Sequence, residues 1–162
     1  MKLTLDVENT TTQRDGKLHL DPFEPENSLT MVGMLNDQGV KRIVTFDHSE
    51  VDADEYGHVL VQEFLDAATI LICHNAAYDL MWLWESGFKY DGPVFDTMLA
   101  EYVLQRGIKE PLSLEACAER YELDTKKQDT LKEYFKQGYS TRNIPYNELC
   151  EYLSADLNAT QQ

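Results

Sequence analysis

The sequence predicts an α/β fold in which a mixed sheet with an antiparallel hairpin is flanked by helices. Residues 29–35 and 40–46 are rich in apolar and β-branched side chains, and the turn residues Asn36-Asp-Gln-Gly39 separate them, which predicts the hairpin. Residues 69–73 form a short, continuous apolar run that is typical of a buried strand, and helical spacing follows it. A buried strand followed by a helix indicates a parallel crossover, so the sheet is mixed.

The other elements follow from side-chain spacing and from capping residues. Residues 2–6 alternate apolar and polar side chains, which predicts the first strand, and a polar loop follows. Helical spacing predicts a helix over 54–68 with Asp54 as its cap, and Asn75 is placed to cap a helix over 75–86. Further helices are predicted at 96–105 behind Asp96, at 113–121, at 126–136, and last with Pro145 in the first turn.

Length and composition narrow the class of protein. We expect residues 1–162 to form one domain, because this length is close to that of an average domain. The 14 Lys and Arg and 29 Asp and Glu give a formal charge of −15, which alone argues against a nucleic-acid partner, yet 43% hydrophobic residues are too many for a disordered acidic tail. No apolar run approaches the roughly 18 residues of a membrane span, so we expect a cytoplasmic protein without a membrane partner.

Two carboxylates end the first predicted strand. Asp6 and Glu8 stand two residues apart, so both side chains project from the same face of the sheet. Adjacent carboxylates repel each other unless a cation neutralises them, and oxygen ligands favour Mg²⁺ or Mn²⁺. Taken alone, the pair is more simply interpreted as an ordinary polar strand end.

Two further groups of polar residues stand on predicted helices. Asn75, Tyr78 and Asp79 lie where a strand passes into a helix, which puts Asp79 in the first helical turn at the carboxyl edge of the sheet, where ligands commonly bind. Tyr152 and Asp156 are four residues apart and share one face of the last helix. Capping, packing or solvation explains each group alone, but the ordered combination of all three groups indicates one site.

In this order the three groups resemble the exonuclease motifs of the DEDD superfamily, tyrosine-type branch, which includes the 3′→5′ proofreading domains of family A DNA polymerases. The resemblance runs from residue 4 to residue 160. Residues 95–104 followed by Leu112-Ser-Leu are similar to the helix after the second motif in those domains, and an Asp6 so near the start resembles a phage-type polymerase. Glu151 stands where the histidine-type branch carries its histidine.

The resemblance implies a ribonuclease-H-like fold and a mechanism with two divalent ions, Mg²⁺ or Mn²⁺, about 3.5–4 Å apart. The implied catalytic residues are four carboxylates, all metal ligands, and one phenol: Asp6, Glu8, Asp79, Asp156 and Tyr152. Asp6 would bridge the ions, Glu8 and Asp156 would complete the site of the attacking water, and Asp79 would bind the second ion largely through water. Tyr152 would orient the nucleophile, because a phenol with a pKa near 10 is a poor base at neutral pH.

The implied substrate is the 3′ end of single-stranded or frayed DNA, and the implied product is a nucleoside 5′-monophosphate. By the same resemblance, Asn75 would contact the terminal nucleotide. Residues 43–70 contain seven acids and no Lys or Arg, whereas residues 120–142 contain six basic residues and four acids. The second stretch is either a phosphate-contacting surface or a solvated, lysine-rich helix. The basic residues that would contact phosphates are Lys126, Lys127, Lys132, Lys136 and Arg142.

Alternatives remain open at this point. Residues 52–63 approximate an EF-hand Ca²⁺ loop, which would make a non-enzymatic Ca²⁺-binding module, although Tyr56 replaces a ligand and a predicted strand precedes the loop. An exonuclease of the same fold could also act on RNA, because no residue pattern signals recognition of a 2′-hydroxyl. Asp156 lies near Gln162 in a helix without a closing turn, so we expect a polymerase domain to follow in cis and to supply most of the cationic surface.

Overall fold

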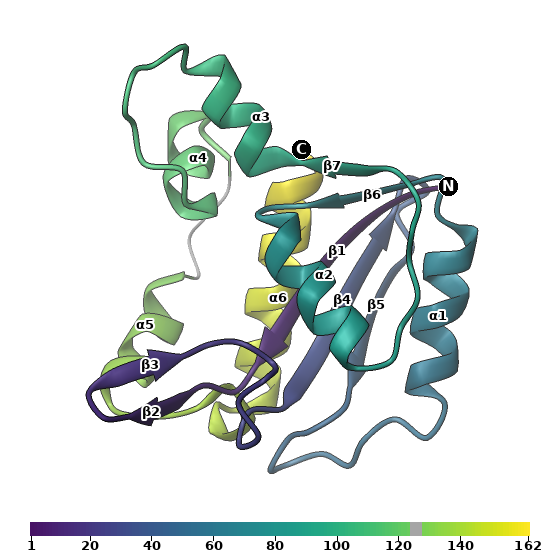
Figure 1. Ribbon diagram of the computed structural model, residues 1–162, viewed down its shortest axis with the longest axis vertical. Helices are drawn as coiled ribbons and strands as arrows, with labels where there is room; N and C mark the ends of the chain where they lie inside the picture. Colours follow the sequence, from purple (N-terminus) through teal and green to yellow (C-terminus); the bar gives the residue numbers. More distant parts are fainter. Residues whose placement is uncertain (124–127) are drawn as a thin grey trace.

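The computed structural model describes residues 1–123 and 128–162 and contains a five-stranded mixed sheet flanked by helices (Figure 1). The strands lie in the order β5 (Lys41–Thr45), β4 (Leu29–Asn36), β1 (Lys2–Asn9), β6 (Ile70–Cys73) and β7 (Val94–Asp96). The pairs β5–β4 and β4–β1 are antiparallel, and the pairs β1–β6 and β6–β7 are parallel. The predicted hairpin and the predicted parallel crossover are both confirmed.

The side chains of the central strand β1 point alternately to the two faces of the sheet, and each face is covered by a different layer. Leu3, Leu5 and Val7 are buried in the larger apolar core together with side chains of α1 (Gly57–Ala67) and α2 (Ala76–Glu85). The alternate residues of β1 therefore face the other layer, which the last helix provides.

The last helix, α6 (Tyr146–Gln161), packs unusually close to the sheet. Gly33 of β4 stands opposite Asp6 of β1, and a Cβ atom at Gly33 would lie 2.8 Å from Cγ of Leu153 and 2.9 Å from Cδ1 of Leu157. No side chain larger than hydrogen fits between strand and helix at this point. The glycine thus allows α6 to approach β1 at the level of Asp6.

Shorter helices complete the fold outside the sheet. They are α3 (Thr97–Leu104), α4 (Leu114–Arg120), α5 (Gln128–Lys136) and the 3₁₀ turn η1 (Thr141–Asn143). Figure 1 shows α3 and α4 extending beyond the edge strand β7, and an ion pair between the buried Glu101 and Arg120 joins these two helices. None of the helices in the described ranges combines the length and the apolar character that crossing a membrane requires.

Two short elements escape the sequence-based prediction. The sequence predicts a polar loop after the first strand, but β2 (Thr12–Arg14) and β3 (Lys17–His19) pair there as a small antiparallel hairpin. Asp15 and Gly16 form its turn with φ angles of 53° and 72°. Asp-Gly is a strong two-residue hairpin signal, so the pattern was available in the sequence. The three-residue β7 carries no such signal.

The capping role predicted for Asp54 is wrong, and the structure also rules out the EF-hand alternative. The helix α1 begins at Gly57 without a side-chain cap, and the Asp54 carboxylate instead accepts a hydrogen bond of 2.8 Å from the backbone N–H of Thr45. A strand, β5, precedes this loop, where an EF-hand requires an entering helix. Asp54 therefore holds the end of β5, and residues 52–63 do not form a Ca²⁺ loop.

The helix predicted over 126–136 is present as α5, which begins at Gln128. Lys126 and Lys127 lie outside the described residues. Asp96 caps α3 with its side chain, as predicted, and Ser113 caps α4.

Substitution of Gly33 tests the close approach of α6. We expect Gly33→Ala to lower the free energy of unfolding by about 1–3 kcal/mol, because the new methyl group overlaps Leu153. Urea-induced unfolding measures the change. In a Leu153→Ala background the same substitution should cost less, because the contacts with Leu153 are gone and only the contact with Leu157 remains. Equal costs in both backgrounds would show that helix packing does not limit this position.

Candidate active site

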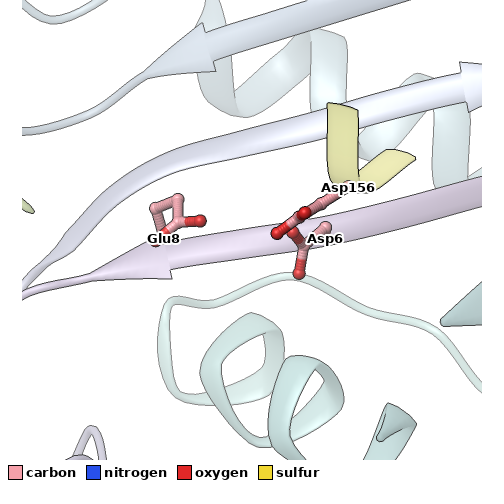
Figure 2. A group of neighbouring side chains, drawn as sticks. All are labelled: Asp6, Glu8 and Asp156. Carbon is pink, nitrogen blue, oxygen red and sulfur yellow. The ribbon is translucent and has the colours of Figure 1, made fainter. Parts of the chain in front are cut away.

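Three carboxylates meet between β1 and α6. Asp6, Glu8 and Asp156 each present an oxygen, and these three oxygens all lie within 4.8 Å of one another. Figure 2 shows Asp6 and Glu8 rising from β1, with Asp156 reaching from α6 toward Asp6. Strand alternation places the first two side chains on one face, and the approach of α6 at Gly33 adds the third.

A fourth carboxylate reaches the same strand from α2. The parallel pairing of β1 with β6 ends at Thr4 and Ile72, and the buried Asp79 lies next to the part of β1 that follows Thr4. Its Oδ1 accepts a hydrogen bond of 3.1 Å from the backbone N–H of Val7, the residue between Asp6 and Glu8. Asp79 is therefore attached to the backbone between the two motif carboxylates, in the first turn of its helix as the sequence predicts.

These four acids disfavour one another's charged forms. Burial, followed by the negative charge of Asp156, raises the pKa of Asp6 to about 8. Burial raises the pKa of Glu8 well above its usual value, with added repulsion from Asp6, Asp156 and Asp79. Burial and the charge of Asp6 likewise raise the pKa of Asp79. A nearby cation would reverse this effect, because it stabilises the ionised carboxylates.

The donor set fits a hard divalent cation. Carboxylate oxygens are the ligands that Mg²⁺ and Mn²⁺ prefer, and in the part of the chain that the structure describes this is the one group of at least three Asp, Glu, His or Cys side chains close enough to share an ion. Asp6, Glu8 and Asp156 could share one ion, and Asp79 stands beside them. These are the four carboxylates that the sequence motifs predict as metal ligands.

Tyr152 lies one turn before Asp156 on α6 and is half-buried. Burial is the main cause that raises the pKa of its phenol above the usual value, and the negative charges of Asp156, Glu8 and Asp6 raise it further. The hydroxyl therefore keeps its proton at neutral pH. It can donate a hydrogen bond in the site, but it cannot act as a base.

Clefts open on both sides of the carboxylates. One, of about 180 Å³, is lined by Glu8, Tyr78 and Phe135 among others, and a second, also of about 180 Å³, is lined by Tyr152, Asp156 and again Phe135. Phe135 of α5 is 47% exposed although it is large and apolar. Phe135 was not predicted from the sequence. On an amphipathic helix, an aromatic residue that lines a cleft has the same sequence pattern as one that packs in the core.

The capping role predicted for Asn75 is wrong, although its position is as expected. Asn75 is exposed at the start of α2 in a left-handed conformation, with φ of 72°, and its side chain makes no capping hydrogen bond. The carboxylate of Asp96 accepts the N–H groups of Asn75 and Ala76 instead, at 3.0 and 2.9 Å. Asp96 reaches them because parallel pairing of β7 with β6 brings it beside the end of β6.

The proposed phosphate-contacting residues are only partly described. The Arg142 side chain, 55% exposed, forms an ion pair of 2.8 Å with Asp47, so contact with a phosphate would require it to exchange partners. Lys132 pairs with Glu115 at the rim of the second cleft. Lys136 is exposed on α5, and Lys126 and Lys127 lie outside the described ranges.

The raised pKa of Asp6 predicts how stability depends on pH without metal. Because the folded protein binds this proton more tightly than the unfolded chain, whose carboxyl has a pKa near 3.8, stability falls as pH rises from 3.8 to about 8. In EDTA, Asp6→Asn should flatten the fall of melting temperature over this range. The exposed Asp52→Asn serves as the control and should keep the wild-type slope. A wild-type slope for Asp6→Asn would contradict the electrostatic coupling.

Comparison with known proteins adds family and fold. A family model described as 3′-5′ exonuclease matches residues 20–162. Similar solved structures include the apo form of a nuclease (TM-score 0.65, 21% identity, covering 99% of this chain and 68% of that chain) and Brucella melitensis NrnC with bound Mg²⁺ (TM-score 0.62, 21% identity, 99% and 68%). A family B DNA polymerase from the archaeon Pyrobaculum calidifontis is also similar (TM-score 0.66, 18% identity, 98% of this chain and 23% of that chain). No curated protein sequence matches significantly.

The three structural matches are below 25% identity and show a shared fold, and the predicted α/β class with a mixed sheet flanked by helices is confirmed. The present chain spans about a quarter of the polymerase it resembles. The family match begins after Asp6 and Glu8, yet the structure brings these two residues to Asp156, inside the matched range. The match covers most of the chain, so the protein belongs to the 3′-5′ exonuclease family, as the order of its acidic motifs predicts.

Proposed function

We propose that this protein is a two-metal-ion 3′→5′ exonuclease that releases nucleoside 5′-monophosphates from the 3′ ends of single-stranded or frayed DNA. The observation that carries the proposal is the meeting of carboxylates from three separate elements, β1, α2 and α6, around the backbone of one strand. Each carboxylate is costly to keep ionised there, so the arrangement opposes folding unless cations bind. Such an arrangement supports a catalytic role better than a structural one.

The carboxylates suit two ions with different surroundings. Asp6, Glu8 and Asp156 would hold one ion, and Asp79, with Asp6, would hold the other. Bound Mg²⁺ or Mn²⁺ would supply a water of lowered pKa and neutralise the charge that develops on the phosphate and the leaving 3′ oxygen. The protein's own contribution is to keep the ligands in place, through the β1 backbone for Asp79 and through α6 packing for Asp156.

Tyr152 would orient the attacking water rather than deprotonate it. Its raised pKa keeps the phenol protonated, and its position one turn from Asp156 places the hydroxyl within the charged site. A fixed hydrogen-bond donor restricts where the nucleophile can sit, which favours in-line attack.

The substrate assignment rests on the shape and chemistry of the two clefts. Tyr78 and Phe135 offer aromatic surface to bases next to Glu8, and aromatic stacking binds single strands without reading their sequence. Asn75 is exposed at the start of the helix that carries Asp79, so its side chain is free to contact the terminal nucleotide. Single-stranded ends would therefore enter more readily than paired ends.

We further propose a proofreading role, with a polymerase domain in cis. A mismatched 3′ end frays at lower cost than a paired end, so a site for single strands would select errors without reading bases. The likeness to part of a family B polymerase supports this context at the level of fold. A formal charge of −15 predicts weak, metal-dependent DNA binding by the chain alone, so the partner domain would supply most cationic surface.

A labelled-oligonucleotide assay tests the activity. With Mg²⁺ or Mn²⁺ we expect stepwise shortening of a 5′-labelled single-stranded DNA from its 3′ end, with release of nucleoside monophosphates, and no shortening in EDTA. Asp6→Ala/Glu8→Ala should abolish shortening, whereas the exposed control Asp52→Ala should retain it. Activity of the double variant equal to wild type would refute the assigned site. An RNA strand of the same sequence, assayed in parallel, decides the substrate class, and faster RNA cleavage would replace DNA by RNA in the proposal.

Tyr152→Phe tests positioning of the nucleophile. Removal of the hydroxyl should lower kcat by about 10–100-fold and leave KM nearly unchanged, because the ring and its packing remain. Single-turnover cleavage at several DNA concentrations separates the two constants. If Tyr152 only positions the nucleophile, the pH–rate profile of Tyr152→Phe should have the same shape as that of wild type. If the variant loses an ionisation that the wild-type profile shows, Tyr152 acts as a base.

A further inference from the structure

One carboxylate at the edge of the sheet receives four backbone N–H groups. Oδ1 of Asp96 accepts hydrogen bonds from Asn75, Met98 and Leu99 at 3.0, 2.9 and 3.3 Å, and Oδ2 accepts one from Ala76 at 2.9 Å. Asp96 is the last residue of β7 and stands opposite Cys73, the last residue of β6. Both strands of this parallel pair are followed by helices.

The donors belong to the beginnings of two different helices. Met98 and Leu99 open α3, for which Asp96 is the ordinary N-cap. Asn75 and Ala76, which lie 21 and 20 residues before Asp96 in the chain, open α2. A single carboxylate thus satisfies unpaired N–H groups of both helices.

This arrangement frees the side chain of Asn75. The residue at this position would ordinarily cap α2 with its own side chain, but the cap comes from Asp96, and Asn75 makes no side-chain hydrogen bond among the described residues. Its left-handed backbone, which Asn tolerates better than most residues, is held by the bond from its N–H to Asp96. The carboxamide is left exposed at the start of the helix that carries Asp79.

The same carboxylate also fixes the start of the helix that carries Asp79. Asp96 holds α2 at Ala76, and three residues later Asp79 accepts the N–H of Val7 on β1. The first turn of α2 is therefore attached at two points, to β7 on one side and to β1 on the other. Loss of the first attachment would let this turn move relative to Asp6 and Glu8.

We propose that Asp96 is a positioning residue of the exonuclease site, which orients the Asn75 carboxamide and the Asp79 carboxylate by capping α2 from a neighbouring strand. The inference rests on the proposed function, and it adds a residue outside the three acidic motifs. Both carboxylate oxygens are needed for this role. Oδ1 accepts the N–H groups of Asn75, Met98 and Leu99, and Oδ2 accepts the N–H of Ala76.

Substitutions with one acceptor separate the two capping tasks. In Asp96→Ser and Asp96→Asn the single oxygen can still cap α3, because Ser and Asn are as favourable as Asp at an N-cap, but the Ala76 N–H of α2 loses its acceptor. We expect kcat/KM on single-stranded DNA to fall by about 10–100-fold, the usual range for residues that orient metal ligands. Asp91→Asn, an exposed acid in the loop before β7, should retain wild-type activity.

A double-mutant cycle distinguishes positioning from general loss of structure. Asn75→Ala should lower kcat/KM in the wild-type background and have a much smaller effect in the Asp96→Ser background, because Asn75 is already displaced there. If Asp96→Ser only lowered overall stability, Asn75→Ala would reduce kcat/KM by the same factor in both backgrounds. Such additive effects would overturn the proposal. Melting temperatures of all four proteins confirm that the comparison is made on folded material.

Amide hydrogen exchange provides a readout that does not depend on activity. Asp96→Ser should accelerate exchange in residues 75–79 and leave residues 98–104 at the wild-type rate. Unchanged exchange in residues 75–79 would overturn the proposal. If wild type cleaves neither DNA nor RNA, the proposed function is wrong; if wild type cleaves and Asp96→Ser keeps the full rate, the positioning role alone is wrong.

Discussion

The contact of α6 with the sheet at Gly33 is the constraint on which the rest of the site depends. Asp6 and Glu8 share a face because of strand alternation, and Asp156 reaches them from α6, which packs closely on β4 where a glycine stands opposite Asp6. The same helix brings Tyr152 into the field of the carboxylates. The absence of a Cβ atom at Gly33 thus favours the close approach that brings the third acidic group to the first.

The electrostatics of the site oppose the apolar packing that surrounds it. Burial and mutual repulsion raise the pKa values of Asp6, Glu8 and Asp79, so the ionised site destabilises the folded protein when no cation is bound. Backbone N–H groups offset part of this cost, as the bond from Val7 to Asp79 shows. The packing of the layers on both sides of β1 thus keeps the carboxylates together despite their mutual repulsion. A bound cation would attract the carboxylates and offset that repulsion.

The first turn of α2 is fixed by hydrogen bonds to two strands of the sheet. The helix begins just beyond the point where β1 and β6 cease to pair, and Ala76 is the only buried apolar residue in its first turn. Asp96 and Val7 hold this turn through hydrogen bonds from two different strands. Rigid placement of ligands matters because a displacement of about 1 Å in an active site can cost roughly a hundredfold in rate.

The sequence by itself determined the strands, most helices and the identity of the acidic residues, because these depend on local periodicity and on residue type. Asp6 and Glu8 share a face because of the two-residue repeat of a strand, and Tyr152 and Asp156 share one because of the helical repeat. Only the tertiary structure decided which carboxylate caps which element: Asp54 holds β5 rather than α1, and Asp96 replaces Asn75 on α2. Those partners are distant in the chain, and hydrogen bonds between distant residues leave no periodic trace in a sequence. Phe135 reached the site for the same reason, through packing that only the folded chain defines.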